Sequence, residues 1–126
     1  MKINELQKKL LEKKIDLALI FSIDEKPNTS MVYLTGYSGI GVLAILQKKA
    51  FLVVPEMEYE KARKTSKIKI FKTEKKKKLI ETLILLIKRE NIKKIGIEEI
   101  SCSVALYKRI KKGIKAYPYS CIMVHL

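Results

Sequence analysis

Residues 42–54 read VLAILQKKAFLVV, and Pro55 follows them directly. Two apolar runs, residues 42–46 and 51–54, flank a short polar connection, which is the pattern of a β-hairpin. Proline cannot donate a ladder hydrogen bond, so we expect the second strand to end there. A sheet that contains this hairpin has at least one antiparallel pair of strands.

Helical and strand patterns alternate on both sides of the hairpin. Apolar periodicity predicts helices over residues 4–14, 57–65, 75–90 and from Ser101 or Ser103 to residue 112, with a helical turn over residues 30–34. Apolar runs predict further strands over residues 17–23, 67–71, 93–98, 114–117 and 121–124. Asn4 is the expected cap of the first helix.

This order of elements defines the expected fold class. Strands that alternate with helices predict one sheet covered by helices, and the hairpin makes that sheet mixed. The fold class is therefore α/β with a mixed β-sheet. No linker divides the chain, so we expect residues 1–126 to form a single domain.

The chain carries 27 Lys and Arg residues against 13 Asp and Glu residues, a formal net charge of +14. Such an excess attracts nucleic acid or acidic membrane surfaces. Only three of the basic residues are arginines, although nucleic-acid recognition favours the bidentate guanidinium. Enrichment in lysine and glutamate is also the compositional bias of hyperthermophile proteins. We favour that bias as the origin of the charge and keep a small basic nucleic-acid-binding domain as the alternative function.

The sequence predicts no membrane association and no export. The longest apolar stretch, residues 40–46, is far shorter than the about 18 residues of a membrane span. Residues 1–14 carry seven charges and no apolar signal segment. We therefore expect a cytoplasmic protein in which Cys102 and Cys121 are free thiols.

Three patterns suggest chemistry but lack the necessary context. Residues 36–40 miss the G-x-S-x-G nucleophile elbow because an isoleucine replaces the last glycine. Residues 39–44 match a relaxed dinucleotide fingerprint, but an apolar strand follows where a helix is required. Cys102, Cys121 and His125 lack the spacing of a metal site. We therefore expect no catalytic, cofactor-binding or metal-binding residue in this chain.

Residues 28–39 read NTSMVYLTGYSG and resemble the Asn-x-x-Tyr-Leu-Thr-Gly-Phe signature in the N-terminal domain of the Xaa-Pro peptidase family. That family includes proline dipeptidases, aminopeptidases P and creatinases. Tyr37 stands where the signature has phenylalanine, and the spacing from Asn28 to Tyr33 is longer. Residues 95–98, Ile-Gly-Ile-Glu, are similar to the family's Ile-Gly-Val-Glu strand. The resemblance extends over nearly the whole chain.

The resemblance implies a mixed α/β sheet of ribonuclease-H-like topology that is not itself catalytic. In that family a following "pita-bread" domain holds two divalent metal ions, such as manganese or cobalt, with two Asp, one His and two Glu residues. This chain has one histidine and two aspartates, so it cannot supply that set. The resemblance therefore implies the non-catalytic N-terminal domain of a cytosolic Xaa-Pro dipeptidase. A free-standing interaction module is a further alternative.

The resemblance also implies a homodimer, because the family's N-terminal domains mediate dimerisation and a loop of one subunit borders the active site of the other. Our candidate loop comprises Thr35, Gly36, Tyr37, Ser38, Gly39 and Gly41. Tyr37 and Ser38 would offer an aromatic face and a hydroxyl group to a bound dipeptide or to the neighbouring subunit. A plain connecting turn is the alternative interpretation. Tyr33 and Leu34 are expected as core anchors.

Overall fold

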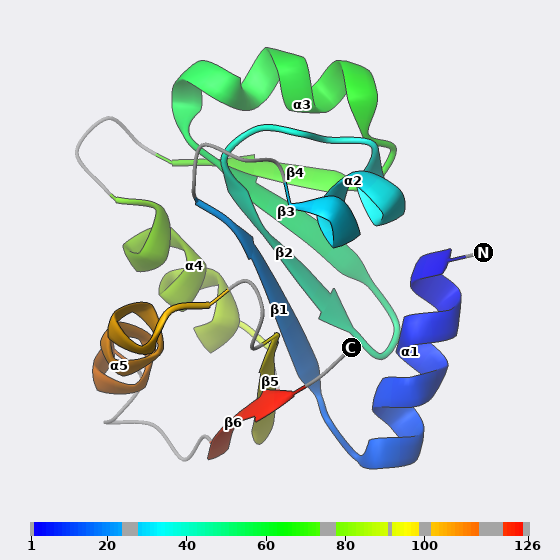
Figure 1. Cartoon of the computed structure of the whole chain (residues 1–126), viewed down its shortest axis with the longest axis vertical. Coiled ribbons are helices and arrows are strands. Elements are labelled where there is room, and N and C mark those ends of the chain that lie inside the picture. The colour runs from blue at the N-terminus through cyan, green and yellow to red at the C-terminus, as the bar shows by residue number, and fades with distance from the viewer. Residues whose placement is uncertain are drawn as a thin grey trace.

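Six strands form one sheet in the computed structural model, which describes residues 2–23, 28–73, 78–90, 92–98, 102–113 and 120–124 (Figure 1). The strands are β1 (Leu17–Ser22), β2 (Gly41–Leu46), β3 (Ala50–Val54), β4 (Lys69–Lys72), β5 (Lys94–Glu98) and β6 (Ser120–Val124). Their order across the sheet is β4-β3-β2-β1-β5-β6. The two edge strands are therefore β4 and β6.

The sheet is mixed, as predicted. β2 pairs antiparallel with both β1 and β3, whereas β1 with β5, β5 with β6 and β3 with β4 are parallel. In the hairpin Val42 pairs with Val53, and the backbone N–H of Leu46 donates to the carbonyl oxygen of Lys49 at 2.8 Å. The hairpin predicted from residues 42–54 is confirmed.

Each predicted helical segment contains a helix among the described residues. The α-helices are α1 (Lys2–Lys13), α2 (Thr29–Thr35), α3 (Tyr59–Thr65), α4 (Leu79–Lys88) and α5 (Val104–Gly113), with a short 3₁₀ helix, η1 (Glu56–Glu58), before α3. The backbone N–H of Leu106 donates to Ser103 Oγ at 3.1 Å, which confirms Ser103 as a cap of α5.

Helices cover both faces of the sheet, and each face has its own core (Figure 1). One core joins α1, α2 and α3 to the sheet through Leu10, Met31, Ala62 and Ile20. The other joins α4 and α5 to the sheet through Leu83, Ile110 and Phe21. Successive strand side chains point to opposite faces, so a strand covered on both sides needs apolar residues at every position. This requirement explains the continuous apolar runs of β1 and β2.

Several predicted boundaries are wrong by a few residues. α1 begins at Lys2, so Asn4 lies inside the helix and does not cap it. The strand predicted at residues 67–71 spans Lys69–Lys72, and the helix predicted at 57–65 is divided into η1 and α3. Apolar periodicity marks the buried face of an element and not its hydrogen-bonded ends, which explains these shifts. Residues 75–77, the strand predicted over 114–117, Ser101 and His125 lie outside the described residues.

Candidate functional site

Asn28 fixes the start of α2. Its side-chain Oδ1 accepts a hydrogen bond from the backbone N–H of Met31 at 2.9 Å, which caps the helix. Its Nδ2 donates to the carbonyl oxygen of Phe21 at 2.9 Å, near the end of β1. The asparagine of the signature-like segment therefore holds α2 against the sheet.

Thr35 and Gly36 end the same helix. Thr35 Oγ1 donates to the carbonyl oxygen of Met31 at 2.8 Å and accepts from the backbone N–H of Tyr37 at 3.1 Å. Gly36 has a φ of 80°, in the left-handed region that favours glycine. A Cβ atom on Gly36 would lie 2.9 Å from the carbonyl oxygen of Thr65. Both residues therefore have structural roles at the end of α2, where Thr35 is buried and Gly36 is exposed.

Tyr37 is completely buried in the core on the α2 side of the sheet. Its hydroxyl donates to the carbonyl oxygen of Ile40 at 2.6 Å and so closes the turn after α2. Burial, and secondly the negative charge of Glu58, raise the pKa of Tyr37 above its ordinary value. The prediction that Tyr37 offers an aromatic face to a ligand is wrong, because the ring fills the core.

Gly39 and Gly41 also have structural roles. A Cβ atom on Gly39 would lie 2.5 Å from Tyr37 Oη, so only glycine lets the chain pass over that ring. Gly41 is the first residue of β2, where it pairs with Ser22 of β1, and it does not belong to the loop. Ser38 is exposed, and its proposed contact with a substrate or a partner stays a prediction.

The exposed part of this segment lies on α2 itself. Tyr33 is 60% exposed and Val32 is exposed as well. The prediction of Tyr33 as a core anchor is wrong, whereas Leu34 is partly buried against the core. Met31 and Thr35, one helical turn apart, form the buried side of α2, so the side chains of Val32 and Tyr33 point away from the core. The four-residue spacing of Met31 and Thr35 is therefore the feature of the sequence that indicates an exposed Tyr33.

A cavity of about 190 Å³ lies beside Tyr33. It is lined by Glu5, Leu6, Lys9, Ile20, Ser30, Tyr33, Leu34 and Glu98. These residues come from α1, β1, α2 and the last position of β5, and Glu98 is buried. Hydroxyl, carboxylate and ammonium groups on apolar walls suit the binding of a polar peptide segment. Among the described residues, this lining includes no histidine or thiol for nucleophilic catalysis.

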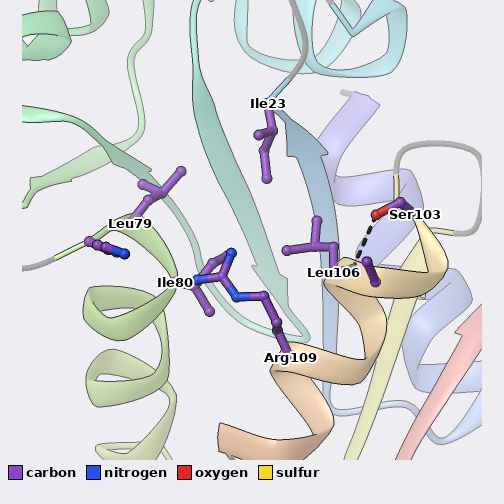
Figure 2. Close-up of a pocket in the computed structure, with 8 residues that line it drawn as sticks. Ile23, Leu79, Ile80, Ser103, Leu106 and Arg109 are labelled. Carbon is purple, nitrogen blue, oxygen red and sulfur yellow. Dashed lines mark hydrogen bonds between the residues drawn. The ribbon is translucent and has the colours of Figure 1, made fainter.

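A larger cavity, of about 370 Å³, lies between the N-terminal parts of α4 and α5 (Figure 2). Figure 2 shows Arg109 reaching from α5 toward Ile80 of α4, with Leu106 beside them. The hydroxyl of Ser103 at its rim accepts a hydrogen bond from the backbone of Leu106 as a helix cap. Among the described residues, this cavity therefore has apolar walls and two cations, Lys78 and Arg109, but no nucleophile paired with a base.

The described residues do not fit a metal centre. No group of three or more His, Cys, Asp or Glu side chains among them is arranged to hold a metal ion. Asp16 accepts hydrogen bonds from the backbone N–H groups of Lys93 and Lys94, both at 2.9 Å, so it joins the start of β1 to the start of β5. Cys102 is buried, and its Sγ donates a hydrogen bond to the carbonyl oxygen of Ser103 at 3.5 Å. In the same residues, no helix combines the length and apolar character of a membrane span.

The chain matches the family model of the creatinase/prolidase N-terminal domain over residues 2–123, and it belongs to that family. No curated protein matches the sequence significantly. The prolidase from Pyrococcus horikoshii OT3 is 29% identical to this chain, with a TM-score of 0.76. The match covers 98% of this chain and 32% of that one.

Two further structures share the fold at lower identity. The Xaa-Pro dipeptidase from Bacillus anthracis superposes with a TM-score of 0.83 at 23% identity, over 98% of this chain and 33% of that chain. The N-terminal domain of the cytoplasmic peptidase PepQ from Mycobacterium tuberculosis H37Rv superposes with a TM-score of 0.81 at 16% identity, over 98% of this chain and 92% of that chain. This chain thus spans about a third of the complete peptidases and nearly all of the separate domain.

Proposed function

We propose that this chain is the non-catalytic N-terminal domain of a cytosolic Xaa-Pro dipeptidase, an enzyme that hydrolyses peptides with proline after the scissile bond. The observation that carries the proposal is the family match over residues 2–123 together with the 29% identity to a prolidase about three times as long.

The chemistry of the whole enzyme belongs to a catalytic domain outside this chain. That domain would hold two divalent metal ions, such as manganese or cobalt, and they would supply an activated water molecule. The residues described above do not fit such a pair, because Asp16 is engaged with two backbone amides and no metal-binding group surrounds it. This chain acts by assembly and by shaping access to the active site.

The surface for that role is α2 and the turn after it. Tyr33, Val32 and Ile40 are exposed there, and the polar cavity with Ser30 and Glu98 lies beside Tyr33. Exposed apolar residues next to a polar hollow are suited to an interface that also meets a peptide. We propose that this surface supports a homodimer and borders the active site of the neighbouring subunit.

The nucleic-acid alternative has less support from the positions of the basic residues. Lys69 lies 5.6 Å from the ring centroid of Phe71, Lys72 lies 5.1 Å from that of Tyr59, and Lys111 lies 5.3 Å from that of Tyr107. These pairs belong to β4, α3 and α5, and in each pair a lysine already lies over the ring on which a base would stack. If the chain does not bind duplex DNA, or binds it with an affinity that does not change with salt concentration, this alternative is excluded.

The experiment that tests the proposal isolates the native protein from its source cells with an antibody against this chain. A polypeptide much larger than 14.5 kDa, which hydrolyses an Xaa-Pro dipeptide and loses that activity on chelation, is the expected result. A native protein of 14.5 kDa with no activity would overturn the proposal. Sedimentation velocity of the 126-residue chain tests dimerisation separately, since a dimer has twice that mass.

A further inference from the structure

A second apolar cavity, of about 310 Å³, lies on the side of the sheet opposite α2. Its walls include Phe51 of β3, Phe71 of β4 and Leu86 of α4. The two phenylalanine rings meet edge to face, with centroids 5.4 Å apart and an interplanar angle of 87°. The volume is at the lower end of the about 300–1,000 Å³ that small-molecule sites occupy. The cavity is therefore large enough for a small aromatic ligand.

The rim of this cavity is positively charged. Lys49, Lys69, Arg89 and Glu90 complete its lining together with Ala50. Lys49 Nζ lies 2.6 Å from Glu90 Oε1, so the carboxylate of the lining is already neutralised by a lysine. Lys69 and Arg89 have exposed side chains, and neither forms an ion pair within the part of the chain that the structure describes. Lys69 Nζ already lies 5.6 Å from the ring centroid of Phe71, so Arg89 is the rim cation left for an anionic ligand.

We propose that this cavity binds an aromatic carboxylate, with the ring against Phe71 and Leu86 and the carboxylate against Arg89. Apolar walls favour the ring, while the planar guanidinium is the group best suited to a carboxylate. Lysines on an edge strand such as β4 also prevent edge-to-edge association, which accounts for Lys69. That explanation does not account for Arg89, which belongs to the end of α4, or for the pair of phenylalanines.

The test titrates the isotopically labelled 126-residue chain with 1-naphthoate and follows backbone amide shifts by NMR. Saturable shifts confined to Ala50, Phe71, Leu86 and Arg89 are expected. The neutral analogue 1-naphthalenemethanol should bind about fivefold more weakly, and acetate should not saturate, because the site needs both the ring and the charge. The proposal does not depend on the peptidase assignment, since it concerns the other face of the sheet and this chain alone.

Two matched variants complete the experiment. Arg89→Gln should weaken 1-naphthoate binding about fivefold. Arg109→Gln, which removes the arginine of the other cavity, should leave binding unchanged. Shifts at Ile80 and Leu106 in place of Phe71 and Leu86, equal affinity for the neutral analogue, or no saturable binding would each overturn the proposal.

Discussion

Tyr33 and Tyr37 lie four residues apart in one segment, yet the first is 60% exposed and the second is completely buried. Tyr33 belongs to α2, whose outer side faces solvent, whereas Tyr37 belongs to the turn that returns the chain to β2. The buried tyrosine holds the turn through its bond to Ile40. The exposed tyrosine is therefore the one available to a partner, and the buried one determines where α2 is held.

This contrast separates two roles within one signature-like segment. Asn28, Thr35, Gly36 and Tyr37 are engaged in caps, a left-handed turn and the core. We expect substitutions at these positions to lower the stability of the domain. Substitutions on the outer side of α2 should leave stability nearly unchanged and affect assembly or activity.

The largest effect is expected from Tyr37→Ala. Removing a buried aromatic side chain leaves a cavity and should lower the free energy of unfolding by about 3–5 kcal/mol. Urea denaturation of the 126-residue chain, followed by circular dichroism, measures this change. The matched control is Tyr33→Ala in the same chain. If Tyr37→Ala and Tyr33→Ala lowered the free energy of unfolding equally, the contrast between the buried and the exposed tyrosine would be wrong.

Gly36→Ala should have the next largest effect. An L-residue at a φ of 80° costs about 1–2 kcal/mol, and the added Cβ would also approach the carbonyl oxygen of Thr65. The same denaturation experiment should show a lower midpoint with an unchanged denaturant slope. A midpoint equal to that of the unmodified chain would mean that the turn relaxes without cost.

Alkaline pH should lower the stability of the folded chain through the ionisation of Tyr37. Because its pKa is raised in the folded chain, the unfolded chain loses this proton first as the pH rises above about 10. The contribution of Tyr37 to the free energy of unfolding is therefore fully present below that pH. Above it the free energy of unfolding decreases by up to about 1.4 kcal/mol per pH unit. Tyr37→Phe should lose this extra pH dependence, and its difference from the unmodified chain isolates Tyr37 from other titrating groups. Parallel pH profiles of the two proteins would contradict the assignment.

The smallest change in stability is expected from Tyr33→Ala, within about 0.5 kcal/mol, since the side chain is mostly exposed. In the complete peptidase that we propose, the same variant should lower kcat/KM on an Xaa-Pro dipeptide or weaken the dimer. Lys8→Ala on the exposed side of α1 is a suitable surface control. Unchanged kinetics and an unchanged dimer would remove α2 from the proposed interface.

Much of the architecture could be predicted because the apolar patterns are strong. The hairpin at residues 42–54 follows from two apolar runs around a polar turn, and the mixed α/β sheet follows from alternation elsewhere. The candidate loop was harder to interpret. Glycine and tyrosine in a short segment suit either an exposed loop or a tightly packed turn, and local sequence does not distinguish them.

The amino-acid sequence is sufficient to predict the order of the elements, their assignment to an α/β sheet and the resemblance of residues 28–39 to a peptidase family. These properties depend on local hydrophobic periodicity and on short motifs, which are present in the chain before it folds. The folded chain was needed to show that Tyr37 is buried, that Tyr33 is exposed and that Phe51 and Phe71 share a cavity with Arg89. Those properties depend on contacts between β3, β4, α2 and α4, which are distant in sequence and meet only when both faces of the sheet are covered.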